Sequence, residues 1–172
     1  GSAKVARIVT LGSPHQGMRL APLGQGHNAR QMRPGSSWLA ALARMISFET
    51  QSTPVPIVGD ASKLRTIVDN LISNAVKFTP RDGTITVELK VVDSTAVITV
   101  RDTGMGIPES ELDKLFSRFF RATTATRNAV PGVGLGLTIT KAIITAHDGL
   151  MGVSSEEGVG TEFSVTLPLA RV

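Results

Sequence analysis

The order of apolar patterns in the last two thirds of the chain limits its fold more than any other feature. Apolar residues recur at helical spacing over residues 61–78, and Asp60 is suited to cap the start of that helix. Alternating apolar and polar residues over 85–91 predict a half-buried strand, and the more apolar segment 96–100 predicts its hairpin partner. We therefore expect this hairpin to pack one face against the helix.

The order of helix, strand and strand then occurs a second time. A second long helix is predicted over residues 135–146, followed by strands over 150–154 and 161–167. A short strand over 54–58 precedes the first helix, and a short helix is expected near 109–119. Antiparallel neighbours with helices on one face make a two-layer α/β sandwich of the α+β class, with a mixed, mostly antiparallel sheet.

Composition excludes several classes of function. The chain contains no cysteine, which rules out disulfides, thiolate metal sites and a cysteine nucleophile. The net charge is +4, but the Lys and Arg residues are scattered and only 4% of residues are aromatic, which argues against nucleic-acid binding. No apolar stretch approaches the roughly 18 residues that span a bilayer, and no signal peptide is recognisable.

The first part of the chain differs in character from the rest. We expect an N-terminal segment of uncertain origin over 1–46 and a folded domain over 47–170, because residues 12–37 are rich in Gly, Pro, Ser, Gln and Asn. Residues 37–46 suggest a short amphipathic helix. Residues 5–17 (VARIVTLGSPHQG) resemble a strand and loop of lipase-like α/β-hydrolases, but the G-x-S-x-G nucleophile elbow is missing. We interpret the segment as a foreign piece, or alternatively as a natural linker, and expect it to be poorly ordered or to pack as an accessory.

Three polar residues share one side of the predicted helix over 61–78. Asn70, Asn74 and Lys77 are four and three residues apart, so they project from one face beside the apolar stripe. Asn is unfavourable inside helices because its amide competes for backbone hydrogen bonds. A solvated polar face is one interpretation. The other is a site for a cation and a phosphate, because amide oxygens suit Mg²⁺ and a lysine pairs with phosphate.

Two glycine-rich segments lie in the domain, one after a predicted strand and one before the second long helix. The first, DTGMGIP, follows a strand, and Asp102 at the strand end is placed to accept a hydrogen bond from an exocyclic amine such as that of adenine. The second, GVGLGL, leads into a helix, whose free N–H groups can bind phosphate. It fits neither a dinucleotide-binding fingerprint nor a P-loop. The loop over 120–134 is long enough to suggest a lid.

Three of the six phenylalanines lie within the short stretch FSRFFR at 116–121. They are either core residues of a short helix or the hydrophobic hinge of a lid. In the second case Arg118 or Arg121 is placed to reach a terminal phosphate.

In this order and spacing, the segments resemble those of sensor histidine kinases. DNLISNAVKFTP resembles their asparagine box, DTGMGIP and GVGLGL their two glycine boxes, and LFSRFFRA their phenylalanine box, while GLMGVSSEEGVGTEFSVTLP resembles their closing strands. The resemblance runs from about Ile46 to Pro168. It favours the kinase branch over the DNA gyrase and MutL branch, which usually has a glutamate where Asn70 stands.

The resemblance implies a Bergerat ATP-binding fold with a flexible lid, and ATP and Mg²⁺ as its ligands. It assigns Asn74 to Mg²⁺, with Asn70 nearby in the same shell, and Lys77 to the phosphates. Arg121 is our first candidate for the lid cation that stabilises the transition state, and Arg118 is the second.

The resemblance also assigns the adenine end of the site. The position of Asp102 bonds the adenine amine, and that of Thr161 lies near the base, often through water. The glycines are implied to make room for the base or to let the lid fold over the triphosphate: Gly104 and Gly106 for the base, and Gly132, Gly134 and Gly136 for the lid.

The implied reaction transfers the γ-phosphoryl group of ATP to a histidine on separate dimerisation helices, and a response regulator is an indirect partner. His15 and His27 lack a helical setting, and His147 fits a helix end, so we expect this chain not to phosphorylate itself. We expect a cytoplasmic module of a membrane-anchored kinase, without membrane contact of its own.

Three alternatives remain open at this point. One is a serine kinase of the anti-sigma type, which shares the ATP fold, although the long phenylalanine-box lid favours a histidine kinase. A second is a nucleotide-sensing module without phosphotransfer, and a third is a hydrolase fragment.

Overall fold

The computed structural model describes residues 5–7, 46–50 and 55–170, and all structural statements concern these residues. Most of the predicted N-terminal segment, including the hydrolase-like residues 8–17 and the predicted helix up to residue 45, lies outside them. The last residue of that predicted helix, Ile46, begins a strand instead.

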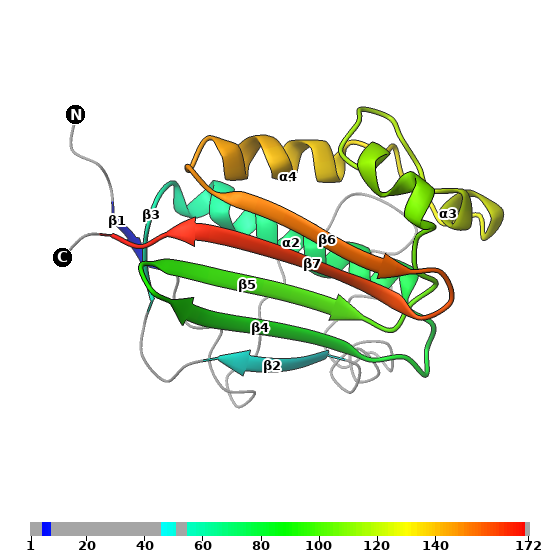
Figure 1. Ribbon diagram of the computed structural model, residues 1–172, viewed down its shortest axis with the longest axis horizontal. Coiled ribbons are helices and arrows are strands. Elements are labelled where there is room, and N and C mark those ends of the chain that lie inside the picture. Colours follow the sequence, from blue (N-terminus) through cyan, green and yellow to red (C-terminus); the bar gives the residue numbers. More distant parts are fainter. Residues whose placement is uncertain (1–4, 8–45, 51–54, 171–172) are drawn as a thin grey trace, which may run out of the picture.

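A five-stranded sheet forms one layer of the domain (Figure 1). The edge strand β2 runs parallel to β4, and all other neighbours are antiparallel, so the predicted mixed and mostly antiparallel sheet is confirmed. The strands in sheet order are β2 (Ile46–Thr50), β4 (Ile85–Val92), β5 (Thr95–Asp102), β7 (Gly160–Pro168) and β6 (Leu150–Glu156).

Helices α2 (Ala61–Phe78) and α4 (Gly136–Thr145) pack against each other and cover one face of this sheet (Figure 1). The predicted cap is confirmed, because the Asp60 carboxylate accepts a hydrogen bond from the backbone N–H of Ser62 at 2.8 Å. The N–H of Thr79 bonds the carbonyl of Ala75 and ends α2 where the sequence predicts.

The core between the two layers is aliphatic apart from Phe163, in keeping with the low aromatic content of the chain. It is formed by the alternate residues of β4, β5 and β7 that face the helices and by the apolar stripe of α2. The largest fully buried side chains are Ile57, Ile67, Leu71, Ile85, Ile144 and Leu167.

Several short elements differ from the sequence-based expectations. Strand β3 (Pro56–Val58) is shorter than predicted and pairs with β1 (Val5–Arg7), which begins the segment that resembles a hydrolase strand and loop. Strand β2 was not predicted. The helix expected near 109–119 is a 3-10 helix over Glu109–Lys114, and helix α3 (Thr123–Arg127) lies in the segment predicted as loop. Short elements carry too few apolar repeats for periodicity to locate them.

Across the described ranges, the helices are too short or too polar to cross a membrane.

Candidate functional site

One cavity brings the predicted motifs together. It lies between the C-terminal half of α2, the loop after β5 and a segment over 120–136 that we call the lid. Figure 1 places the end of β5, the start of α4 and helix α3 at the same end of the sheet. Ten of the predicted site residues line the cavity: Asn70, Asn74, Lys77, Asp102, Gly106, Arg121, Gly132, Gly134, Gly136 and Thr161. Gly104 and Arg118 do not.

Asp102 forms the inner wall, where β5 ends. Its side chain is buried, and Oδ1 accepts a hydrogen bond from the backbone N–H of Gly104 at 2.8 Å. Burial raises the pKa of the Asp102 carboxyl above its ordinary value, and hydrogen bonds from the backbones of Gly104 and Thr161 partly oppose that rise. The cavity therefore contains an acceptor whose charge is poorly solvated, which favours a ligand that donates hydrogen bonds to it.

The glycines of the loop after β5 permit close backbone contacts. A Cβ on Gly104 would lie 2.5 Å from the carbonyl oxygen of Phe78, so this glycine lets the loop pack on the end of α2. Gly106 has φ +63°, and its Cβ would lie 1.9 Å from the carbonyl oxygen of Glu156. Gly104 thus lies behind the cavity wall, while Gly106 belongs to the wall itself.

Asn70, Asn74 and Lys77 line the cavity from one face of α2, as the spacing predicts. The Asn70 amide Nδ2 donates a hydrogen bond to Thr140 Oγ1 at 2.6 Å, and Thr140 on α4 is fully buried. A Cβ on Gly136 would lie 2.6 Å from Asn70 Oδ1, so the first turn of α4 packs directly on this amide. Thr140 was not identified from the sequence, because its contact partner is 70 residues away.

The glycine-rich end of the lid packs closely on the phenylalanine box, in which the lid begins. The backbone N–H of Phe119 donates to the carbonyl of Gly134 at 2.9 Å. Gly134 has φ +75°, and its Cβ would lie 2.5 Å from the carbonyl oxygen of Phe120. A Cβ on Gly132, by contrast, would meet nothing within 4 Å. The phenylalanine box therefore fixes one end of the lid, and Gly134 is the residue whose conformation allows it.

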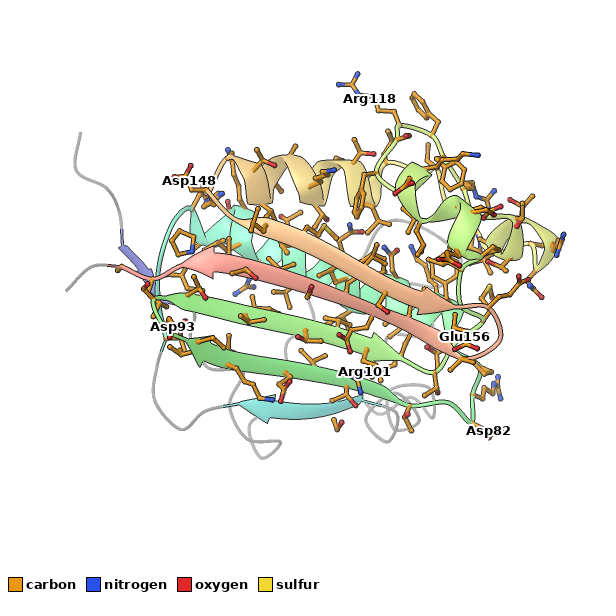
Figure 2. All side chains as sticks on the ribbon, viewed as in Figure 1. Asp82, Asp93, Arg101, Arg118, Asp148 and Glu156 are labelled. Carbon is orange, nitrogen blue, oxygen red and sulfur yellow. The ribbon has the colours of Figure 1, made fainter. Side chains whose placement is uncertain are left out.

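The two candidate arginines have different surroundings. The Arg121 guanidinium lines the cavity and donates a hydrogen bond to the carbonyl of Val130 across the lid. Arg118 is exposed, and Figure 2 shows its side chain at the outer edge of the molecule, pointing away from the sheet.

A small hydrogen-bond network supports the cavity beside Asp102. Ser155 Oγ on β6 lies 2.8 Å from Thr161 Oγ1 and 2.8 Å from the carbonyl oxygen of Gly160, and it accepts the backbone N–H of Ile107 at 2.9 Å. Thr124 Oγ1 on α3 donates to the carbonyl of Gly106 at 3.0 Å. Ser155 and Thr124 were not identified from the sequence, since an isolated hydroxyl residue in a strand or short helix carries no pattern.

His147 has a structural role at the end of α4. Its Nδ1 lies 2.7 Å from the carbonyl oxygen of Ile143, and its Nε2 accepts the backbone N–H of Asp60 at 3.2 Å. A Cβ on Gly59 would lie 2.4 Å from the His147 ring, so a larger residue there would displace the ring. His147 therefore joins the end of α4 to the start of α2, away from the cavity.

The donor set of the cavity suits one kind of metal ion. Among the described residues no group of three or more His, Asp or Glu side chains lies close enough to hold a metal. On the α2 side of the cavity, the side-chain oxygens available for a cation are the amide oxygens of Asn70 and Asn74, which lie one turn apart. Such a set fits Mg²⁺, which binds few protein oxygens and keeps water and phosphate oxygens as its other ligands.

Residues 59–171 match the family model described as histidine kinase-, DNA gyrase B- and HSP90-like ATPase. The sensor histidine kinase RcsC of Escherichia coli K12 is 40% identical over 122 residues, which cover 71% of this chain and 13% of RcsC. The sensor histidine kinase WalK of Bacillus subtilis is 40% identical over 111 residues, covering 63% of this chain and 18% of WalK. The chain thus spans less than a fifth of the length of these relatives.

Solved structures of histidine kinases share the fold of this chain. A mycobacterial sensor histidine kinase, MprB, superposes with a TM-score of 0.65 at 35% identity and covers 76% of this chain and 89% of its own. A nucleotide-free catalytic domain of the histidine kinase ThkA superposes with a TM-score of 0.63 at 27% identity, over 76% of this chain and 84% of that chain.

Proposed function

Because this chain belongs to the histidine kinase-, DNA gyrase B- and HSP90-like ATPases and is a catalytic ATP-binding domain of two-component sensor histidine kinases, we propose that its cavity binds ATP for phosphoryl transfer. The domain binds ATP with Mg²⁺ and transfers the γ-phosphoryl group to a nitrogen of a histidine on separate dimerisation helices. A response regulator then receives the phosphoryl group from that histidine. The parent kinase is anchored in the membrane, with this domain in the cytoplasm.

The observation that carries this proposal is the buried carboxylate of Asp102 in the wall of a cavity that apolar residues also line. An ionised carboxylate only accepts hydrogen bonds. The exocyclic amine of adenine is a donor that this carboxylate can accept, and Met105, Ile107 and Leu137 of the cavity wall supply apolar contact for a planar ring.

The other side of the cavity suits the triphosphate. Lys77 and Arg121 supply positive charge, and the lid glycines lead into the N-terminus of α4, where backbone N–H groups of the first turn can bind phosphate. Arg121 lines the cavity and hydrogen-bonds the carbonyl of Val130 across the lid, so it is the lid cation that we assign to the γ-phosphate.

Asn74 and Asn70 are the residues that would hold Mg²⁺. When bound, the ion neutralises phosphate oxygens and orients the triphosphate for in-line transfer. The contribution of the chain's own side chains is then to fix those oxygens, because phosphoryl transfer depends mainly on positioning and charge neutralisation.

In the transfer, the acceptor imidazole nitrogen forms a bond to the γ-phosphorus as the bond from that phosphorus to the bridging oxygen of ADP breaks. Lys77 and Arg121 compensate the charge on the departing and transferring oxygens. The phenylalanine box and Gly134 hold the lid over the triphosphate, which excludes water that would otherwise compete as the acceptor.

Calorimetry of ATP and ADP, with and without Mg²⁺, tests the binding part of this proposal. We expect micromolar to millimolar binding by the wild-type chain and its loss in Asp102→Asn. Phosphotransfer is then tested with a supplied His-bearing helical dimer and, as a matched control, the same dimer with His replaced by Gln. A folded wild-type chain that binds neither nucleotide would contradict the proposal. Phosphorylation of a serine on a partner protein, but not of the histidine on the helical dimer, would instead indicate the serine-kinase alternative.

A further inference from the structure

Ser155 does not line the cavity, but it contacts a residue that does. Ser155 lies where β6, β7 and the loop after β5 meet. Its Oγ has three hydrogen-bond partners: Ile107 N–H at 2.9 Å, the Gly160 carbonyl oxygen at 2.8 Å and Thr161 Oγ1 at 2.8 Å. Thr161 is buried and lines the cavity, and Thr161 and Asp102 are paired across β5 and β7.

The hydrogens of this network can be assigned by counting. Ile107 N–H can only donate, and the Gly160 carbonyl can only accept. The single Ser155 hydroxyl hydrogen therefore goes to Gly160, and the Thr161 hydroxyl must then donate to Ser155 Oγ. The opposite direction, with Ser155 donating to Thr161, would leave the Gly160 carbonyl without this bond and the Thr161 hydrogen without a partner.

This assignment decides what Thr161 offers to the cavity. Its hydrogen points to Ser155, so only its lone pairs face a ligand, and it acts there as an acceptor. Asp102, its cross-strand neighbour, is also an acceptor. The pair presents acceptors alone, which suits a group that carries two hydrogens, and it opposes a carbonyl oxygen at the same place.

We infer that Ser155 is a positioning residue that sets base specificity: by accepting the Thr161 hydroxyl hydrogen, it makes Thr161 an acceptor for the 6-amino group of adenine, directly or through one water. The inference rests on the proposed function. Ser155 itself touches neither the base nor the reacting atoms.

The test compares the affinities of ATP and inosine triphosphate, whose base carries a 6-oxo group in place of the amino group. The full chain is used as wild type, Ser155→Ala, Thr161→Val and the double variant, and unfolding temperatures are measured alongside. In Ser155→Ala the Thr161 hydroxyl is free to rotate and donate to the 6-oxo group. We expect the ratio of the two affinities to fall by about twofold to tenfold, the worth of one neutral hydrogen bond.

The double-mutant cycle separates this role from a structural one. If Ser155 acts through Thr161, then Ser155→Ala in the Thr161→Val background leaves the affinity ratio unchanged. Ser155→Cys, which keeps the side-chain size but bonds weakly, provides the same comparison if Ser155→Ala fails to fold.

Equal losses of both affinities in Ser155→Ala, with an unchanged ratio, would overturn the inference, because a residue that only holds the loop would weaken both nucleotides alike. The inference would also be overturned if Ser155→Ala changed the affinity ratio equally in the wild-type and Thr161→Val backgrounds. A folded wild-type chain that binds no ATP would overturn the proposed function, and this inference with it, whereas the first two outcomes leave the proposed function intact.

Discussion

Asp102 and Thr161 lie directly opposite each other on β5 and β7, and both line the cavity. Sequence separates them by nearly sixty residues, and the antiparallel register alone makes them neighbours. This pair joins the first glycine-rich loop to the closing hairpin, because Gly160, the residue before Thr161, has φ +146° and its Cβ would lie 2.0 Å from the Asp102 carbonyl oxygen.

Asp102→Asn should strongly weaken nucleotide binding without harming the fold. The Asn carbonyl can still accept the N–H of Gly104, but its amide group then faces the adenine amine with donors instead of acceptors. We expect calorimetry to show an ATP affinity lower by about tenfold or more, the worth of a hydrogen bond to a charged group. Retained affinity would mean that the base binds elsewhere.

The same variant should also change how stability depends on pH. Burial raises the pKa of Asp102 in the folded state, so the folded state binds the proton more tightly than the unfolded one. The stabilisation from that proton is present at low pH and is lost as the pH rises through the raised pKa. Asp102→Asn should abolish this part of the decline, and chemical denaturation of both proteins across the acidic range measures it. Parallel curves for the two proteins would contradict the assignment.

Arg121 and Arg118 form a matched pair, three residues apart with the same charge. Arg121→Gln should lower the rate of phosphotransfer to a supplied histidine domain by at least about tenfold, because lid arginines act on transition-state charge. The affinity for ATP should change less than the rate. Arg118→Gln should retain most of the activity, since Arg118 does not line the cavity and its side chain points away from the sheet (Figure 2). Equal effects in the two variants would indicate that neither arginine has a specific role.

Gly134→Ala and Gly132→Ala are a second matched pair of variants, and they test the glycines of the lid. Alanine at 134 must adopt φ +75° with its Cβ 2.5 Å from the Phe120 carbonyl, whereas alanine at 132 meets open space. We expect Gly134→Ala to weaken ATP binding several-fold and to increase proteolysis within the lid, and Gly132→Ala to do neither. Similar behaviour of both variants would mean that the contact with the phenylalanine box does not control the lid.

Thr140→Val should misplace Asn70. The substitution preserves shape but removes the oxygen that accepts the Asn70 amide, leaving that amide without its partner beside a fully buried position. The free energy of unfolding should fall by about 1–3 kcal/mol. The gain in ATP affinity on adding Mg²⁺ should also shrink, while ATP affinity without Mg²⁺ changes little. Thr140→Ser, which keeps the hydroxyl, should restore both, and an unchanged response to Mg²⁺ would show that Thr140 is only structural.

The long elements could be predicted from the sequence, and so could the motifs that the fold gathers around the cavity. The apolar stripe of α2 and the alternation in β4 and β5 are local patterns, and local periodicity follows directly from helix and strand geometry. The same holds for the shared face of Asn70, Asn74 and Lys77. The family is evident from the order of four motifs.

Features that depend on contacts between residues far apart in the chain could not be predicted. The strand β2 and helix α3 are too short to carry a pattern, and their partners lie far away in the chain. The contact of Asn70 with Thr140 and the network around Ser155 arise from the packing of α2 on α4 and of β6 on β7. Hydrogen bonds between residues far apart in sequence leave no periodic signal, so only the folded structure shows which hydroxyl groups orient the site.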